Sequence, residues 1–189
     1  MKTTQKILLA FVFLLAITTM YAQEYKANKE QSSLNWTGKA AFNAYKLSGA
    51  LKIKSGDLII KDNQIEQLNI TIDMRSLNHS NGDLKKHLRS KDFFEVKKYP
   101  TAVFTLTKPI RIYGDEITLQ GTMKIKKTIR EETIIAKISM KDDTITISID
   151  TKLDRTKYGV KFNSPSFFKK MKENAIADRF SLKGMFMFN

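Results

Sequence analysis

The chain has 189 residues, of which 33 are Lys or Arg and 19 are Asp or Glu, giving a formal net charge of +14, and it has no cysteine. The lack of cysteine excludes a small domain held by disulfides, and the length suits a single domain with its own core. Many of the lysines alternate with apolar residues, which is typical of the solvated face of a sheet and argues against a nucleic-acid partner. The alternative is that the positive charge attracts the protein to an anionic envelope surface.

Residues 1–22 are typical of a secretion signal. They have a basic start, an uncharged apolar run over residues 7–17 that is too short to span a bilayer, and the small residue Ala22 at the expected cleavage point. We therefore expect export to the periplasm or beyond and a single folded domain over residues 23–189, with a retained anchor as the alternative.

From residue 34 onward, apolar and polar residues alternate, which predicts strands with one apolar face each. In chain order, the apolar positions of these runs are Leu34 and Trp36; Leu47, Gly49, Leu51 and Ile53; Leu58 and Ile60; Leu68, Ile70, Ile72 and Met74; Ala102, Phe104 and Leu106; Ile110 and Ile112; Ile117, Leu119, Gly121, Met123 and Ile125; Ile134, Ala136, Ile138 and Met140; Ile145, Ile147 and Ile149; and Leu182, Gly184, Phe186 and Phe188.

Residues that favour tight turns separate many of these runs, at residues 55–57, 62–63, 114–115 and 142–143. Short connections imply antiparallel neighbours, because parallel strands need long crossovers. The pattern predicts a mainly β fold of eight or more strands, and such a sheet must close or fold on itself to hide its apolar face.

Two segments break the alternation. Ser80 followed by Asp83 resembles a capping box, and Leu84 with Leu88 forms one apolar stripe, which predicts a short helix at about residues 81–90. A second helix is predicted from its starting residues. It begins at Ser164 and Pro165, with Phe167, Phe168 and Met171 facing inward.

The sequence contains no motif of a phosphate-binding loop, a nucleophile elbow or a zinc protease, so we do not expect an enzyme. His79, Asp83 and His87 are spaced four apart, and a helix would stack them on one side. Such a set could hold a divalent metal or the headgroup of a polar ligand. We interpret it instead as an exposed helix face and predict no metal site.

The segment over residues 88–104 is dense in aromatic residues, and here the chain resembles the YceI-like family of lipid- or polyisoprenoid-binding proteins of bacterial envelopes. The similarity extends over about residues 28–188. The matching residues are Leu88, Ser90, Asp92, Phe93, Phe94, Val96, Lys98, Tyr99, Pro100 and Phe104, with Ile72, Asp73, Ser76 and Leu77 before them and Leu119, Gly121, Ile125, Arg155, Tyr158, Gly159, Ile176 and Asp178 after them.

The resemblance implies an extended, lipocalin-like barrel of eight antiparallel strands, with a helix at its side or mouth and an elongated apolar ligand in its lumen. Phe93 and Phe94 would close the barrel end beneath the helix, either as packing residues alone or as ligand contacts as well. A barrel of this size can also be filled by its own side chains, and composition does not choose between these cases. The candidate lumen residues are Trp36, Leu51, Ile70, Phe93, Phe94, Phe104, Leu106, Ile125, Ile138, Ile147, Tyr158 and Phe186.

The expected function is therefore an exported protein that carries or sequesters a long apolar lipid, such as a polyprenyl chain or an isoprenoid quinone. Because hydrocarbon burial is favourable without polar anchors, few polar groups are required. The alternative is an envelope interaction module that docks its basic surface on anionic lipid or a partner protein without a lumen ligand. The oligomeric state is not predicted.

Overall fold

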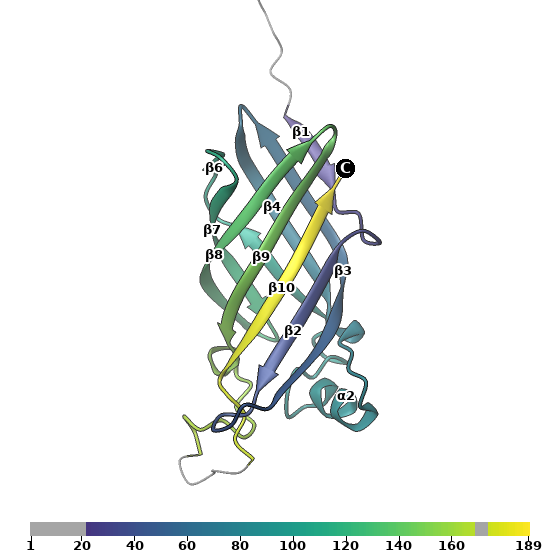
Figure 1. Cartoon of the computed structure of the whole chain (residues 1–189), viewed down its shortest axis with the longest axis vertical. Coiled ribbons are helices and arrows are strands. Elements are labelled where there is room, and N and C mark those ends of the chain that lie inside the picture. The colour runs from purple at the N-terminus through teal and green to yellow at the C-terminus, as the bar shows by residue number, and fades with distance from the viewer. Residues whose placement is uncertain (1–21, 169–173) are drawn as a thin grey trace, which may run out of the picture.

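The computed structural model describes residues 22–168 and 174–189 (Figure 1). The predicted signal over residues 1–22 therefore lies outside the described residues, apart from Ala22. Within the described part, no helix is both long enough and apolar enough to cross a membrane. The predicted mainly β architecture is confirmed.

The described residues form ten strands and three short helical elements. The strands are β1 Gln23–Lys26, β2 Ser33–Lys39, β3 Lys46–Lys61, β4 Gln64–Asp73, β5 Thr101–Leu106, β6 Ile110–Arg111, β7 Glu116–Ile125, β8 Thr128–Lys141, β9 Thr144–Asp154 and β10 Arg179–Phe188. The helical elements are the 3-10 helices η1 Met74–Ser76 and η2 Arg155–Tyr158 and the α-helix α2 Gly82–Arg89.

Eight of the strands close into the predicted antiparallel barrel. The order around it is β3, β2, β10, β9, β8, β7, β5 and β4, and a further pairing between β3 and β4 completes the ring. The short strands β1 and β6 extend it at β3 and β4. Closure gives each of these eight strands a partner strand on both sides. It also encloses the apolar face of each strand.

The turn predicted at residues 55–57 is wrong, because β3 runs through these residues as one strand of sixteen. Its pairing with β4 shifts register between Ile53 and Ser55, where one extra residue is accommodated. This irregularity moves the buried side chains from odd positions, such as Leu51 and Ile53, to even positions, such as Leu58 and Ile60. The residues that suggested a turn therefore bend a continuous strand.

Tight two-residue turns join several neighbouring strands. Asp62 and Asn63 connect β3 to β4 with φ angles of 51° and 59°, and Asp142 begins the turn from β8 to β9 with a φ of 52°. Lys126 begins the turn from β7 to β8 with a φ of 54°. Asp and Asn tolerate this left-handed region better than most residues, which explains why the first two turns were visible in the sequence.

The helix predicted at about residues 81–90 is confirmed as α2, and it lies beside one end of the barrel (Figure 1). Its N-cap is Asn81, which accepts a hydrogen bond from Leu84 N, rather than Ser80. The helix predicted after Ser164 is replaced, as far as Phe168, by a turn at residues 165–167, and both Phe167 and Phe168 are exposed instead of facing inward. Met171 lies outside the described residues.

Gly49 on β3 leaves room for the segment that follows η1. The backbone N–H of Asn78 donates to Ala50 O at 3.0 Å, and a Cβ atom at Gly49 would overlap the carbonyl oxygen of Asn78 and lie 2.7 Å from Trp36 Nε1. Close approach of these two backbones therefore requires glycine.

We predict that Gly49→Ala lowers the free energy of unfolding by about 1–3 kcal/mol or more, because the added methyl group overpacks this contact. Gly38→Ala is the matched control, since its Cβ would lie at an ordinary distance of 3.9 Å from Trp36 Cζ3. Denaturant unfolding followed by circular dichroism measures both variants. Equal losses in the two would contradict the steric explanation.

Candidate functional site

An internal space, here called the principal cavity, lies at the end of the barrel beside α2. It has a volume of about 100 Å³, and its walls are almost entirely apolar. Residues from β2, β3, β4, β5, β7 and β10 form the barrel wall, and Leu77, Leu88 and Phe93 close it from the segments around α2. Such a lining offers a site for hydrocarbon and few hydrogen-bonding groups for a polar ligand.

A second hollow of about 270 Å³, here called the vestibule, adjoins this cavity. Its lining combines Leu84 and Leu88 of α2 with residues 38–47 and residues 174–176. Five residues line both spaces and thus form the wall between them: Trp36, Gly38, Leu88, Phe93 and Ile176. The vestibule thus lies between the apolar face of α2 and the wall of the inner cavity.

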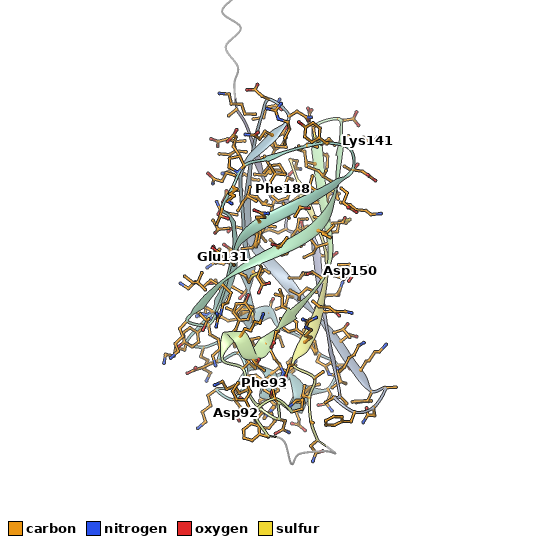
Figure 2. The ribbon with its side chains drawn as sticks, turned by 90° about the vertical axis from the view of Figure 1, so that its left-hand side faces the viewer. Asp92, Phe93, Glu131, Lys141, Asp150 and Phe188 are labelled. Atoms are coloured by element: carbon orange, nitrogen blue, oxygen red, sulfur yellow. The ribbon has the colours of Figure 1, made fainter. Side chains whose placement is uncertain are left out.

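The opposite half of the barrel is filled by side chains. Leu58, Ile65, Leu68 and Phe188 have no exposed surface, and none of them lines the cavity or the vestibule. Figure 2 places Phe188 toward this closed end and Phe93 toward the end that holds the cavity. A smaller space of about 30 Å³ lies between the two halves. Among the described residues, the lumen is thus divided into a packed half and a partly open half.

The structure places the twelve candidate lumen residues in three groups. Trp36, Leu51, Phe93, Phe94 and Ile125 line the principal cavity. Ile70, Phe104, Ile147 and Phe186 line the smaller space. Leu106, Ile138 and Tyr158 line neither of them, and Leu106 is only half-buried.

Other cavity residues were not among the candidates. Ile72, Met123 and Leu182 lie on predicted strands with the correct parity, so alternation identified their face but not their level along the barrel. Phe180 lies at the start of β10, before the alternating run. Leu88 was predicted to lie on the apolar stripe of the short helix but was not among the lumen candidates. It lines the cavity because this apolar stripe faces the barrel.

Among the described residues that line the principal cavity, Arg155 is the one that is charged, and it is 4% exposed. Its guanidinium donates hydrogen bonds to the carbonyl oxygens of Val160, Phe162, Ile176 and Ala177 at 2.8–3.1 Å. These bonds join the segment after η2 to the segment before β10. Sequence reasoning saw Arg155 only as part of the family resemblance, because its partners are backbone atoms that leave no residue pattern.

The charge of Arg155 is balanced by Asp178, whose Oδ1 lies 3.8 Å from Nη2. Burial lowers the pKa of Arg155, and the carboxylate of Asp178 opposes this shift. Asp178 in turn accepts hydrogen bonds from the hydroxyl groups of Ser164 and Ser166. Because its guanidinium bonds to groups within the protein, Arg155 holds in place the backbone segments on this side of the cavity.

Tyr158 is buried and its hydroxyl donates to Glu132 Oε1 at 2.6 Å. Burial, followed by this hydrogen bond, raises the pKa of Tyr158 above its ordinary value. The phenol therefore stays protonated at neutral pH, and the arrangement is a structural bond between β8 and η2.

The two histidines do not form an exposed helix face with Asp83. His87 is half-buried, with its ring centroid 5.1 Å from Phe93 and 4.7 Å from Phe162. His79 precedes α2, lies near Trp36, and accepts a hydrogen bond from Asn81 N at Nδ1. No group of three His, Cys, Asp or Glu residues able to hold a metal ion was found in the described ranges 22–168 and 174–189.

We predict that Arg155→Met lowers the free energy of unfolding by about 3–5 kcal/mol, because Asp178 and four carbonyl groups lose their buried partner. Arg111→Met, at an exposed position on β6, is the control and should change stability by less than about 0.5 kcal/mol. Denaturant unfolding of both variants tests this role. A loss of stability no larger than that of the control would show that Arg155 does not hold these backbone segments in place.

Sequence comparisons place the chain among proteins of one family. The model of the YceI-like domain matches residues 25–186. Protein YceI of Salmonella agona (strain SL483) is 29% identical over 152 residues, which cover 74% of this chain and 75% of that protein. Protein YceI of Salmonella newport (strain SL254) is 30% identical over 125 residues, 65% of each chain.

Solved structures share the fold at low sequence identity. Burkholderia cenocepacia BcnA has a TM-score of 0.65 and 17% identity, covering 85% of this chain and 98% of that one. A polyisoprenoid binding domain from Saccharophagus degradans, implicated in plant cell wall breakdown, has a TM-score of 0.65 and 11% identity, covering 87% and 97%. The matching domain and the shared barrel together establish that this chain belongs to the YceI-like domain family.

Proposed function

We propose that the protein binds a long apolar lipid and holds part of its hydrocarbon tail in the cavity beside α2. The observation that carries this proposal is the apolar cavity of about 100 Å³ next to the vestibule of about 270 Å³. The ligand class we propose is a polyprenyl chain or an isoprenoid quinone. The similarity to a polyisoprenoid binding domain supports this class.

The size of the cavity determines how such a lipid can enter. An apolar cavity of about 150 Å³ accepts a molecule the size of benzene, so the cavity as it stands accommodates only a short segment of a chain. A longer segment requires the wall between the two spaces, which includes Trp36, Leu88 and Phe93, to open toward the vestibule. Each 100 Å² of hydrocarbon withdrawn from water contributes about 2.5 kcal/mol toward this rearrangement.

Binding rather than catalysis fits the chemistry of the cavity. Its one charged residue, Arg155, already donates to backbone carbonyls and faces Asp178. We propose export to the periplasm or beyond, with the domain over residues 23–189 performing carriage or sequestration. The alternative role, in which a basic exterior docks on an anionic surface without a lumen ligand, leaves the cavity and vestibule unexplained.

We predict that protein purified from bacterial cells carries an apolar lipid from the native membranes in its interior. Denaturing the protein, extracting it with organic solvent and analysing the extract by mass spectrometry identifies that lipid. A prenyl chain or quinone in roughly stoichiometric amount is the expected result. An extract without any lipid enrichment over an unrelated protein purified in parallel would contradict the proposal.

Two substitutions of opposite effect locate the tail. Ala102→Leu places a larger side chain in the cavity wall. It should reduce the amount of bound lipid without lowering stability, because the cavity has room for the added atoms. Phe93→Ala enlarges the cavity and should retain or increase binding, although it costs about 3–5 kcal/mol of stability.

Phe188→Ala is the matched control for Phe93→Ala, because it removes the same atoms from the packed half of the barrel. It should lose similar stability but keep the lipid content of the original protein. Lipid per protein, measured by the same extraction, separates the two. Equal lipid content in Ala102→Leu and the original protein would place the tail elsewhere.

A further inference from the structure

A large cationic hollow lies on the other side of α2, outside the barrel. It has a volume of about 920 Å³ and is lined by residues of η1, α2 and the segment over residues 90–98. Lys85, Lys86 and Arg89 enter it from α2, and Arg75 enters it from η1. Helix α2 therefore presents leucines to the vestibule and cations to this hollow.

The segment after α2 adds Lys91, Lys97 and Lys98 to the same hollow. Cations in the last turn of a helix are common because they interact favourably with its C-terminal carbonyl groups. That effect accounts for Lys86 and Arg89 but not for the three lysines that lie beyond the helix. Another explanation is needed for cations that gather from three separate elements.

The backbone holds the two groups of cations together. Val96 N donates to Arg89 O at 3.1 Å, and Phe94 N donates to Leu88 O at 3.2 Å, so the segment folds back on the end of α2. Phe93, at 4% exposure, fixes the same segment to the barrel core. The backbone around the hollow is thus held in place by these contacts.

Carboxylates do not balance this charge. Glu95 is the one acidic residue in the lining, and its Oε2 lies 3.9 Å from Lys126 Nζ, which is not part of the hollow. None of the seven cations forms an ion pair with a carboxylate among the residues that the structure describes. Like charges held close together repel, and an anion bound among them removes that repulsion.

We propose that this hollow is a binding site for phosphorylated anions. Arginine and lysine are the side chains best suited to phosphate oxygens, because they form charge-assisted hydrogen bonds with them. A phosphate diester of a lipid headgroup and a soluble diphosphate share this chemistry. The site is separate from the apolar cavity, so it goes beyond the proposed lipid-tail function and does not depend on it.

Charge reversal at the exposed lysines tests the site. The hollow variant is Lys86→Glu, Lys91→Glu and Lys97→Glu, and the matched control is Lys137→Glu, Lys152→Glu and Lys183→Glu on the outer face of β8, β9 and β10. Both variants change the net charge by the same amount at exposed positions. Non-specific attraction would therefore fall equally in the two.

Two probes separate the sources of phosphate. Binding of sodium pyrophosphate is measured by calorimetry, and binding of vesicles of phosphatidylglycerol with phosphatidylcholine is measured by sedimentation, both at low salt. We expect the hollow variant to lose about tenfold or more in affinity while the control keeps most of it. Pyrophosphate binding identifies a soluble phosphate as a ligand, and vesicle binding alone identifies a lipid headgroup.

Three further measurements make the result decisive. Circular dichroism and denaturant unfolding establish that both variants fold, and a milder set, Lys86→Gln, Lys91→Gln and Lys97→Gln, should give an intermediate loss. Lipid extracted from the barrel should be unchanged in the hollow variant, which distinguishes this site from the lumen. Equal losses in the hollow and control variants, or no binding of either probe by the original protein, would overturn the proposal.

Discussion

Pairing between β3 and β4 is the contact on which the rest of the structure depends. The other strands form a continuous antiparallel sheet from β3 to β4, and this pairing joins its two ends. Without it, a sheet with one apolar face would present two open edges to other chains. With it, the same apolar face becomes the interior, and the cavity residues that lie on the strands take their positions from the ring.

β3 can make this contact because it is long and bent. Its first half pairs with β2 and its second half with β1, while β4 pairs with its residues from Lys52 to Lys61. The change of buried parity between Ile53 and Leu58 was visible in the sequence. The alternating runs predicted a mainly β fold that must close or fold on itself, and the family resemblance implied a barrel. The irregular strand was mistaken for a turn, because Ser, Gly and Asp are compatible with both and only the partner strand decides between them.

The candidate site could be predicted in part for a similar reason. Alternation identifies which side chains face inward, so it pointed to Trp36, Leu51 and Ile125, and the family resemblance implied that Phe93 lies at the barrel end beside the helix. Alternation carries no information on how completely opposing side chains fill the space between them. The division into a packed half and an open half, and the frame around Arg155, depend on contacts between residues distant in the sequence and were therefore missed.

One contact between the two ends of the described domain affects how the protein folds. Ser32, just before β2, accepts a hydrogen bond from the backbone N–H of Met187 on β10, a partner 155 positions later. During synthesis, this hydrogen bond cannot form until nearly all of the chain between Ser32 and Met187 has been made. Contacts of such long range slow folding, so β2 and β10, which pair with each other, can complete this part of the barrel only when synthesis of the chain is almost finished.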